Sequence, residues 1–135
     1  MKVTRRQRIL IVTDAGQTEF MRGVLAARGF SVTAAADYES AYHQLLEARF
    51  TLVVIDLVAV VEGIEFIRRV HATTNLTQPL LLVIAEWGTG AGGLALTQGA
   101  DAYEPKPIDA ARLVDSVERL LGTKALWARG KMGAE

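Results

Sequence analysis

Short apolar runs alternate along the chain with longer segments in which apolar residues recur at helical spacing. The runs predict five strands, at residues 9–12, 31–34, 52–55, 80–85 and 102–104. Three of these runs are apolar at every position, which is typical of strands that are buried on both faces rather than on one. The pattern therefore predicts a sheet that is covered by helices on both sides.

Four of the intervening segments carry apolar residues three and four positions apart, as amphipathic helices do. These predicted helices cover residues 18–28, 38–49, 62–72 and 109–122. Asp37 and Asp109 are suited to cap the helices that follow them, and Gly29 and Gly122 are suited to end the helices that precede them. The four predicted helices each lie between or after predicted strands, so the chain is an alternating strand–helix sequence.

The segment between the fourth and fifth strands is the exception, because it holds Gly88, Gly90, Gly92 and Gly93. A glycine inside a helix costs about 1 kcal/mol relative to alanine. We therefore predict that any helix here begins near Gly92 or later. Five strand–helix units in 122 residues indicate an α/β fold: a doubly wound, flavodoxin-like, five-stranded parallel sheet in the order 2-1-3-4-5.

The amino-acid composition excludes several classes of function. The 135 residues suit one domain, and 15 basic residues balance 15 acidic ones, whereas a nucleic-acid-binding domain usually has a basic excess. The chain has no cysteine, which excludes disulfides, thiol catalysis and zinc held by cysteine. It has 2 histidines, too few for a histidine-rich metal site. No apolar run approaches the length of a membrane span or a signal peptide, so we expect a cytoplasmic protein.

Polar residues follow the predicted strands at the ends where a doubly wound sheet binds its ligands. Asp14 ends the first strand, Asp56 ends the third, and Lys106 follows the fifth. Strands 1 and 3 are neighbours in the predicted order, so the two carboxylates should converge, with the lysine nearby. Two carboxylates can hold Mg²⁺, a metal-bound aspartate can accept a phosphoryl group, and a lysine can offset its charge.

These residues resemble the motifs of the response-regulator receiver domain, the CheY-like family, over about residues 8–122. The resemblance rests on three segments: residues 9–14, 52–57 and 99–107. It implies that Asp56 is the phosphoacceptor, that Asp14 and the Val58 backbone carbonyl are metal ligands beside it, and that Lys106 contacts the phosphate. Tyr103 falls on the family's aromatic switch position. The resemblance also implies a histidine kinase or phosphotransfer protein as the phosphodonor, and a signalling face made of the fourth helix, fifth strand and fifth helix.

Three positions depart from the family pattern. Thr13 stands where the first of two adjacent acids is usual, and loss of that carboxylate weakens cation binding by roughly 1–4 kcal/mol. Ile84 stands at the other switch position, where a serine or threonine hydroxyl usually meets the phosphate. The Val58 side chain, two residues after the acceptor, is unable to position an attacking water.

Three functions remain open at this point. The leading one is a stand-alone, non-enzymatic receiver that is phosphorylated on Asp56 with Mg²⁺, and the alternative is a pseudo-receiver that binds proteins without phosphorylation. A distant third, a small nucleotide-binding enzyme, follows from the G-x-G-x-x-G spacing of residues 88–93, although this stretch is not in the first strand–helix turn.

The segments outside the receiver region are short. Residues 1–7 form a basic arm and residues 123–135 a tail with Trp127, which either packs on the domain or meets a partner. Neither has room for an output domain, so we expect output through another, unidentified protein, without direct nucleic-acid contact or membrane insertion. Dimerisation through the last strand and helix, common in the family, is left open.

Overall fold

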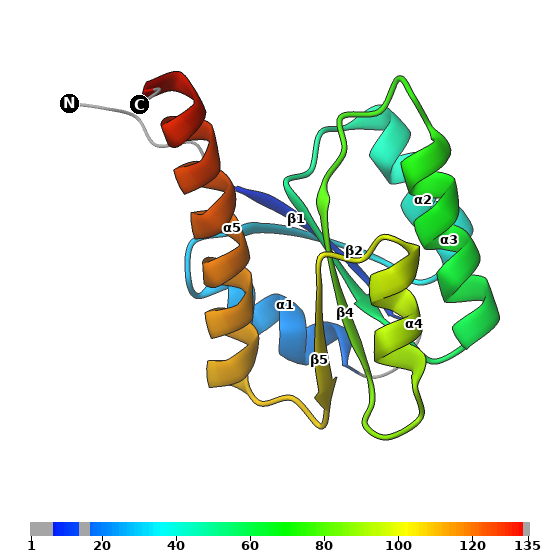
Figure 1. The fold of residues 1–135 in the computed structure, drawn as a ribbon. Coiled ribbons are helices and arrows are strands. Elements are labelled where there is room, and N and C mark those ends of the chain that lie inside the picture. The colour runs from blue at the N-terminus through cyan, green and yellow to red at the C-terminus, as the bar shows by residue number, and fades with distance from the viewer. Residues whose placement is uncertain (1–6, 14–16, 134–135) are drawn as a thin grey trace.

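The computed structural model describes residues 7–13 and 17–133, and in them strands and helices alternate from end to end (Figure 1). The strands are β1 (Arg8–Val12), β2 (Ser31–Ala35), β3 (Leu52–Asp56), β4 (Leu80–Glu86) and β5 (Ala102–Lys106). The helices are α1 (Thr18–Ala26), α2 (Tyr38–Glu47), α3 (Val60–Ala72), α4 (Ala91–Gln98) and α5 (Ala110–Gly133). None of the described helices is long and apolar enough to cross a membrane.

The strands form one parallel sheet in the order β2-β1-β3-β4-β5, which confirms the predicted fold class and strand order. The register aligns Val12 of β1 with Ile55 of β3, and Asp56 with Ile84 of β4. Because all five strands run the same way, their carboxyl ends meet at a single rim. Residues that follow different strands, far apart in the chain, are thereby gathered at that rim.

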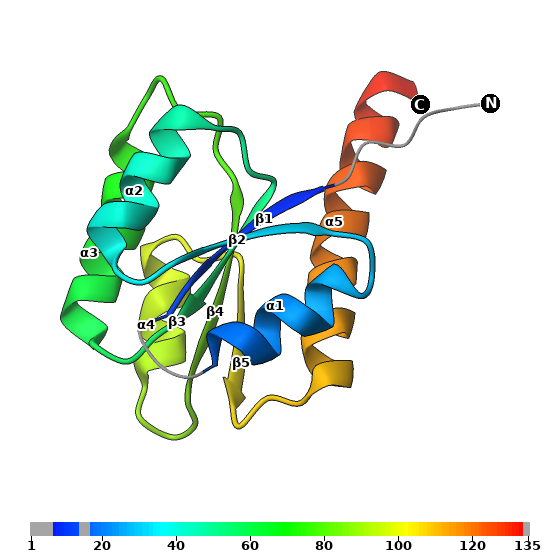
Figure 2. The same cartoon turned by 180° about the vertical axis from the view of Figure 1, so that it is seen from behind.

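Helices cover both faces of the sheet, with α2, α3 and α4 on one side and α1 and α5 on the other (Figures 1 and 2). Alternate residues of each strand belong to two hydrophobic cores, one on each face of the sheet. Leu10, Val53 and Val83 pack with α2, α3 and α4, whereas Ile9 and Val54 pack with α1 and α5. All five of these side chains are fully buried, as the uninterrupted apolar runs predicted.

The predicted end of the last helix at Gly122 is wrong, because α5 continues to Gly133. A Cβ at Gly122 would meet no neighbouring atom, and no proline follows it, so nothing in the sequence stops the helix there. The other helix boundaries differ from the predictions by one or two residues: α1 ends at Ala26, α2 ends at Glu47, α3 begins at Val60 and α4 begins at Ala91.

Candidate functional site

Asp56 is a buried carboxylate with both oxygens engaged. Its side chain is 2% exposed. Oδ2 accepts a hydrogen bond of 2.7 Å from Oγ1 of Thr13, which is itself buried. Oδ1 lies 2.6 Å from Nζ of Lys106 in an ion pair, and has no hydrogen-bond donor among the other described residues. Thr13, Asp56 and Lys106 therefore form one closed cluster, which we call the Asp56 triad.

The sheet brings the triad together from three strands. Thr13 follows β1 and continues its ladder, since its N–H donates to the Ala35 carbonyl at 3.2 Å. Asp56 is the last residue of β3, and the next N–H, of Leu57, donates to the Ile84 carbonyl at 2.8 Å. Lys106 ends β5 and reaches across the end of β4, where its ammonium also lies 3.5 Å from the Leu57 carbonyl. The predicted convergence of Asp56 and Lys106 is thus confirmed.

Asp14, the second predicted carboxylate, lies outside the described residues, as do residues 1–6 of the predicted arm and the side chain of Trp127. The bond between Lys106 and Pro107 is cis. The Lys106 side chain is 23% exposed, so the ion pair sits where the protein interior meets solvent.

Two pockets open on either side of Asp56. One, of about 270 Å³, is lined by Thr13, Val58 and two further carboxylates, Asp37 and Glu62. The Ser40 backbone N–H, which donates to Asp37 across 2.7 Å, lowers the pKa of Asp37 below its usual value and so favours its charged form. Asp37 therefore keeps its charge to a lower pH than an unperturbed aspartate does.

The oxygen donors on this side of Asp56 fit a hard divalent cation. The Asp56 carboxylate, the Thr13 hydroxyl and the Val58 backbone carbonyl belong to residues that line the same pocket, and Mg²⁺ prefers oxygen ligands with several waters retained. Among the described residues no three acidic or histidine side chains are grouped closely enough to hold a metal by themselves. Asp14, the other predicted metal ligand, lies outside the described residues.

The second pocket, of about 310 Å³, has a mixed polar and apolar lining. Its lining includes Asp56, Glu86 and Lys106 together with Met21, Ile84 and Ile108. Ile84 is fully buried in the core beneath α1 and α5, where it offers no hydroxyl toward the carboxylate. The polar link that the family usually places at this position is absent from this strand.

Tyr103, the second switch position, lies on the opposite face of the sheet from Ile84. Its ring is half-buried and packs against the core shared by α2, α3 and α4. The two switch positions thus belong to different cores, so a change at Ile84 has no direct packing route to Tyr103.

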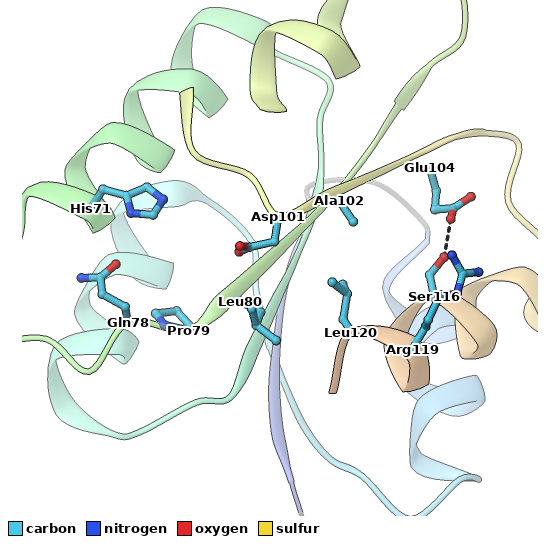
Figure 3. A pocket seen from close by; sticks show the side chains of 10 residues that line it. All are labelled: His71, Gln78, Pro79, Leu80, Asp101, Ala102, Glu104, Ser116, Arg119 and Leu120. Atoms are coloured by element: carbon cyan, nitrogen blue, oxygen red, sulfur yellow. Dashed lines mark hydrogen bonds between the residues drawn. The ribbon is translucent and has the colours of Figure 1, made fainter. Parts of the chain in front are cut away.

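A larger pocket, of about 650 Å³, was not predicted from the sequence and holds none of the predicted site residues. Figure 3 shows it around the amino-terminal ends of β4 and β5, with Leu80, Ala102 and Leu120 between two polar groups. The polar groups are His71, Gln78 and Asp101 on one side, and Glu104, Ser116 and Arg119 on the other. Because these residues come from separate segments and share no motif, no sequence signal marks them. The pocket is at the opposite end of the strands from Asp56.

The glycine stretch at residues 88–93 spans the connection from β4 to α4 and the start of α4. Gly88 and Gly90 have φ angles of 85° and 84°, which favour glycine, and α4 begins directly after them. Residues 87–90 therefore form the turn, and Gly92 and Gly93 lie in the first turn of α4. Its place after the fourth strand differs from the first-turn position of a dinucleotide fingerprint.

Comparisons with known proteins agree with this fold. A family model described as the response regulator receiver domain matches residues 9–118. The DNA-binding response regulator MtrA of Mycobacterium tuberculosis is 34% identical over 120 residues, which are 87% of this chain and 52% of MtrA. Protein PetR of Rhodobacter capsulatus is 33% identical over 84% of this chain and 48% of its own length. This chain spans about half the length of these curated relatives.

Solved structures give the same result. The signal receiver domain of a response regulator from Bermanella marisrubri is 27% identical with a TM-score of 0.78, covering 87% of this chain and 99% of that one. The chemotaxis response regulator CheY4 of Vibrio cholerae, at 22% identity, shares the fold with a TM-score of 0.77 over 85% of this chain and 98% of its own. With the family model matching most of the chain, and with the sheet order and the pairing of Asp56 with Lys106 in place, this protein belongs to the response-regulator receiver domain family.

Proposed function

We propose that this receiver accepts a phosphoryl group on Asp56, with Mg²⁺, and signals through protein–protein contact. The observation that carries the proposal is a buried carboxylate at the ends of the strands with a lysine ammonium 2.6 Å from it. The phosphodonor would be a histidine kinase or a phosphotransfer protein in the cytoplasm, and the output a downstream protein. The chain would be the acceptor in this reaction and would have no separate enzymatic activity.

The proposed chemistry places the new bond on one carboxylate oxygen of Asp56. That oxygen attacks phosphorus as the phosphorus–nitrogen bond of a phosphohistidine breaks, and the released imidazole takes up a proton. Mg²⁺, when bound, supplies positive charge to the phosphoryl oxygens. The Lys106 ammonium, already at the carboxylate, would shift its contact to a phosphoryl oxygen, and the Thr13 hydroxyl would hold the other carboxylate oxygen in place.

A second function is favoured by the same triad. Thr13 and Lys106 together engage both oxygens of Asp56, so the carboxylate is already neutralised and hydrogen-bonded without a phosphoryl group. Such a closed site suits a pseudo-receiver, which would bind its partner in this single state. In that case an Asp56→Asn variant would bind the partner as well as the parent does.

Incubation with acetyl phosphate and Mg²⁺, followed by intact-mass measurement, tests the proposed function. We expect the parent to gain the mass of one phosphoryl group and Asp56→Asn, which has no carboxylate nucleophile, to gain none. Absence of the gain in the parent at high donor and metal concentrations would overturn phosphorylation and leave the pseudo-receiver function. An equal gain in the variant would show that the acceptor is another residue.

Once formed, the phosphoryl group is expected to be lost slowly, over minutes or longer. Val58 borders the acceptor and its side chain is 55% exposed, but it has no polar atom to orient an attacking water. Val58→Asn is expected to speed the loss several-fold, measured as the decay of the phosphorylated mass. The matched control is Val61→Asn, the same change at a 67% exposed position that does not line the pocket. Hydrolysis of the parent within seconds, or equal acceleration by both variants, would contradict this role of Val58.

A further inference from the structure

Gly92 is a glycine that the proposed function does not explain. Unlike Gly88 and Gly90, it lies inside α4, where its φ angle is not positive and glycine weakens the helix relative to alanine. It is also buried, whereas its neighbour Gly93 is exposed. A buried glycine at a helical position calls for a steric reason.

The reason is the ring of Tyr103. A Cβ atom at Gly92 would overlap Cγ, Cδ1 and Cε1 of that ring, far inside van der Waals contact. The ring therefore lies directly on the backbone of the first turn of α4, in a notch that only glycine leaves open. A Cβ at Gly93, one residue further, would meet no atom within 4 Å.

Side chains of α3 hold the carboxyl end of α4. Arg68 of α3 donates to the Gln98 side chain at 2.8 Å, and His71 Nε2 lies 2.9 Å from the Gly99 carbonyl. At the first turn, the Thr89 hydroxyl accepts a hydrogen bond of 3.2 Å from the Ala91 N–H, a contact with the preceding loop rather than with β5. The contact between Gly92 and Tyr103 joins this turn to β5, which lies beside α4 in Figure 1.

We propose that Gly92 is the residue that positions Tyr103. Its notch holds the ring against α4, and so sets the shape of the surface where α4 meets β5. The inference goes beyond the proposed function and does not depend on phosphorylation of Asp56. Ile84 belongs to the core on the other face of the sheet and takes no part in positioning the Tyr103 ring.

The test compares Gly92→Ala with Gly93→Ala in the full chain labelled with 3-fluorotyrosine. Tyr103→Phe identifies the Tyr103 signal in the ¹⁹F NMR spectrum. We expect Gly92→Ala to shift that signal and to increase its broadening by a soluble paramagnetic reagent at least twofold. Gly93→Ala adds the same methyl group without a contact, so it should leave the signal unchanged and raise the Tm. An unchanged signal in Gly92→Ala, with the same rise in Tm, would overturn the proposal.

A double-variant comparison keeps the test decisive if Gly92→Ala folds poorly. In a Tyr103→Ala background the overlapping ring is gone, so Gly92→Ala and Gly93→Ala should change the Tm in the same direction and by similar amounts. A loss of Tm that persists for Gly92→Ala in this background would show that the notch serves another neighbour, and would overturn the assignment to Tyr103.

Discussion

Lys106→Met is expected to lower the free energy of unfolding by about 3 kcal/mol, the scale on which breaking a buried ion pair destabilises a protein. The substitution keeps most of the aliphatic stem but removes the ammonium 2.6 Å from Asp56. The Asp56 side chain is 2% exposed, so its charge would stay buried with the Thr13 hydroxyl as its remaining described partner. Urea unfolding at pH 7, with and without the substitution, measures the loss.

The control removes the charge of the other partner in the ion pair. Asp56→Asn keeps an oxygen that can accept from Thr13, and Lys106, with its side chain 23% exposed, can turn its ammonium toward water. We therefore expect a loss of less than about 1 kcal/mol from Asp56→Asn, consistent with an uncharged residue in a hydrogen-bonded site. Adding Asp56→Asn to Lys106→Met should recover most of the lost stability. Equal losses from the two single variants would show that Asp56 is not held as a buried charge.

Thr13→Asp is expected to raise the affinity for Mg²⁺ by about tenfold or more, because a carboxylate replaces a neutral hydroxyl in the pocket beside Asp56. Without metal the two close carboxylates repel each other, so the variant should be less stable than the parent. With millimolar Mg²⁺ its Tm should rise by more than that of the parent, since a ligand that binds only the folded state stabilises it. Thermal unfolding across a Mg²⁺ titration measures both effects.

Thr13→Val is the matched control, since it is close to threonine in shape and adds no charge. It removes the hydrogen bond to Asp56 Oδ2 and should leave the dependence of the Tm on Mg²⁺ no steeper than in the parent. A Thr13→Asp variant with the same metal dependence as Thr13→Val would contradict the placement of the cation between position 13 and Asp56.

The strand order and the meeting of Asp56 with Lys106 could be predicted from the sequence, because both follow from the alternation of strands and helices. Once the strands are parallel, residues that end different strands must share a rim, whatever their separation in the chain. The hydrogen bond from Thr13 to Asp56 could not be predicted. The sequence shows that an acid is missing at position 13, but not that the hydroxyl replacing it reaches Asp56.

Two other features escaped prediction because they depend on contacts across the fold. The predicted start of α4 near Gly92 is close to the observed start at Ala91, but the packing of the Tyr103 ring on Gly92 joins two different elements and has no local signal. The end of α5 was misplaced because Gly122 looks like a stop signal locally, although α5 continues past it. Local propensity was a weak guide at both positions, as is usual where propensity alone is used.

The site of phosphorylation tests the central claim most directly. After reaction with acetyl phosphate and Mg²⁺, borohydride reduces an aspartyl phosphate to homoserine, which peptide mass mapping locates along the chain. We predict homoserine at position 56, and unmodified aspartate there when the phosphodonor is omitted. Unmodified aspartate at position 56 after full reaction, or a modification confined to another residue, would contradict the account.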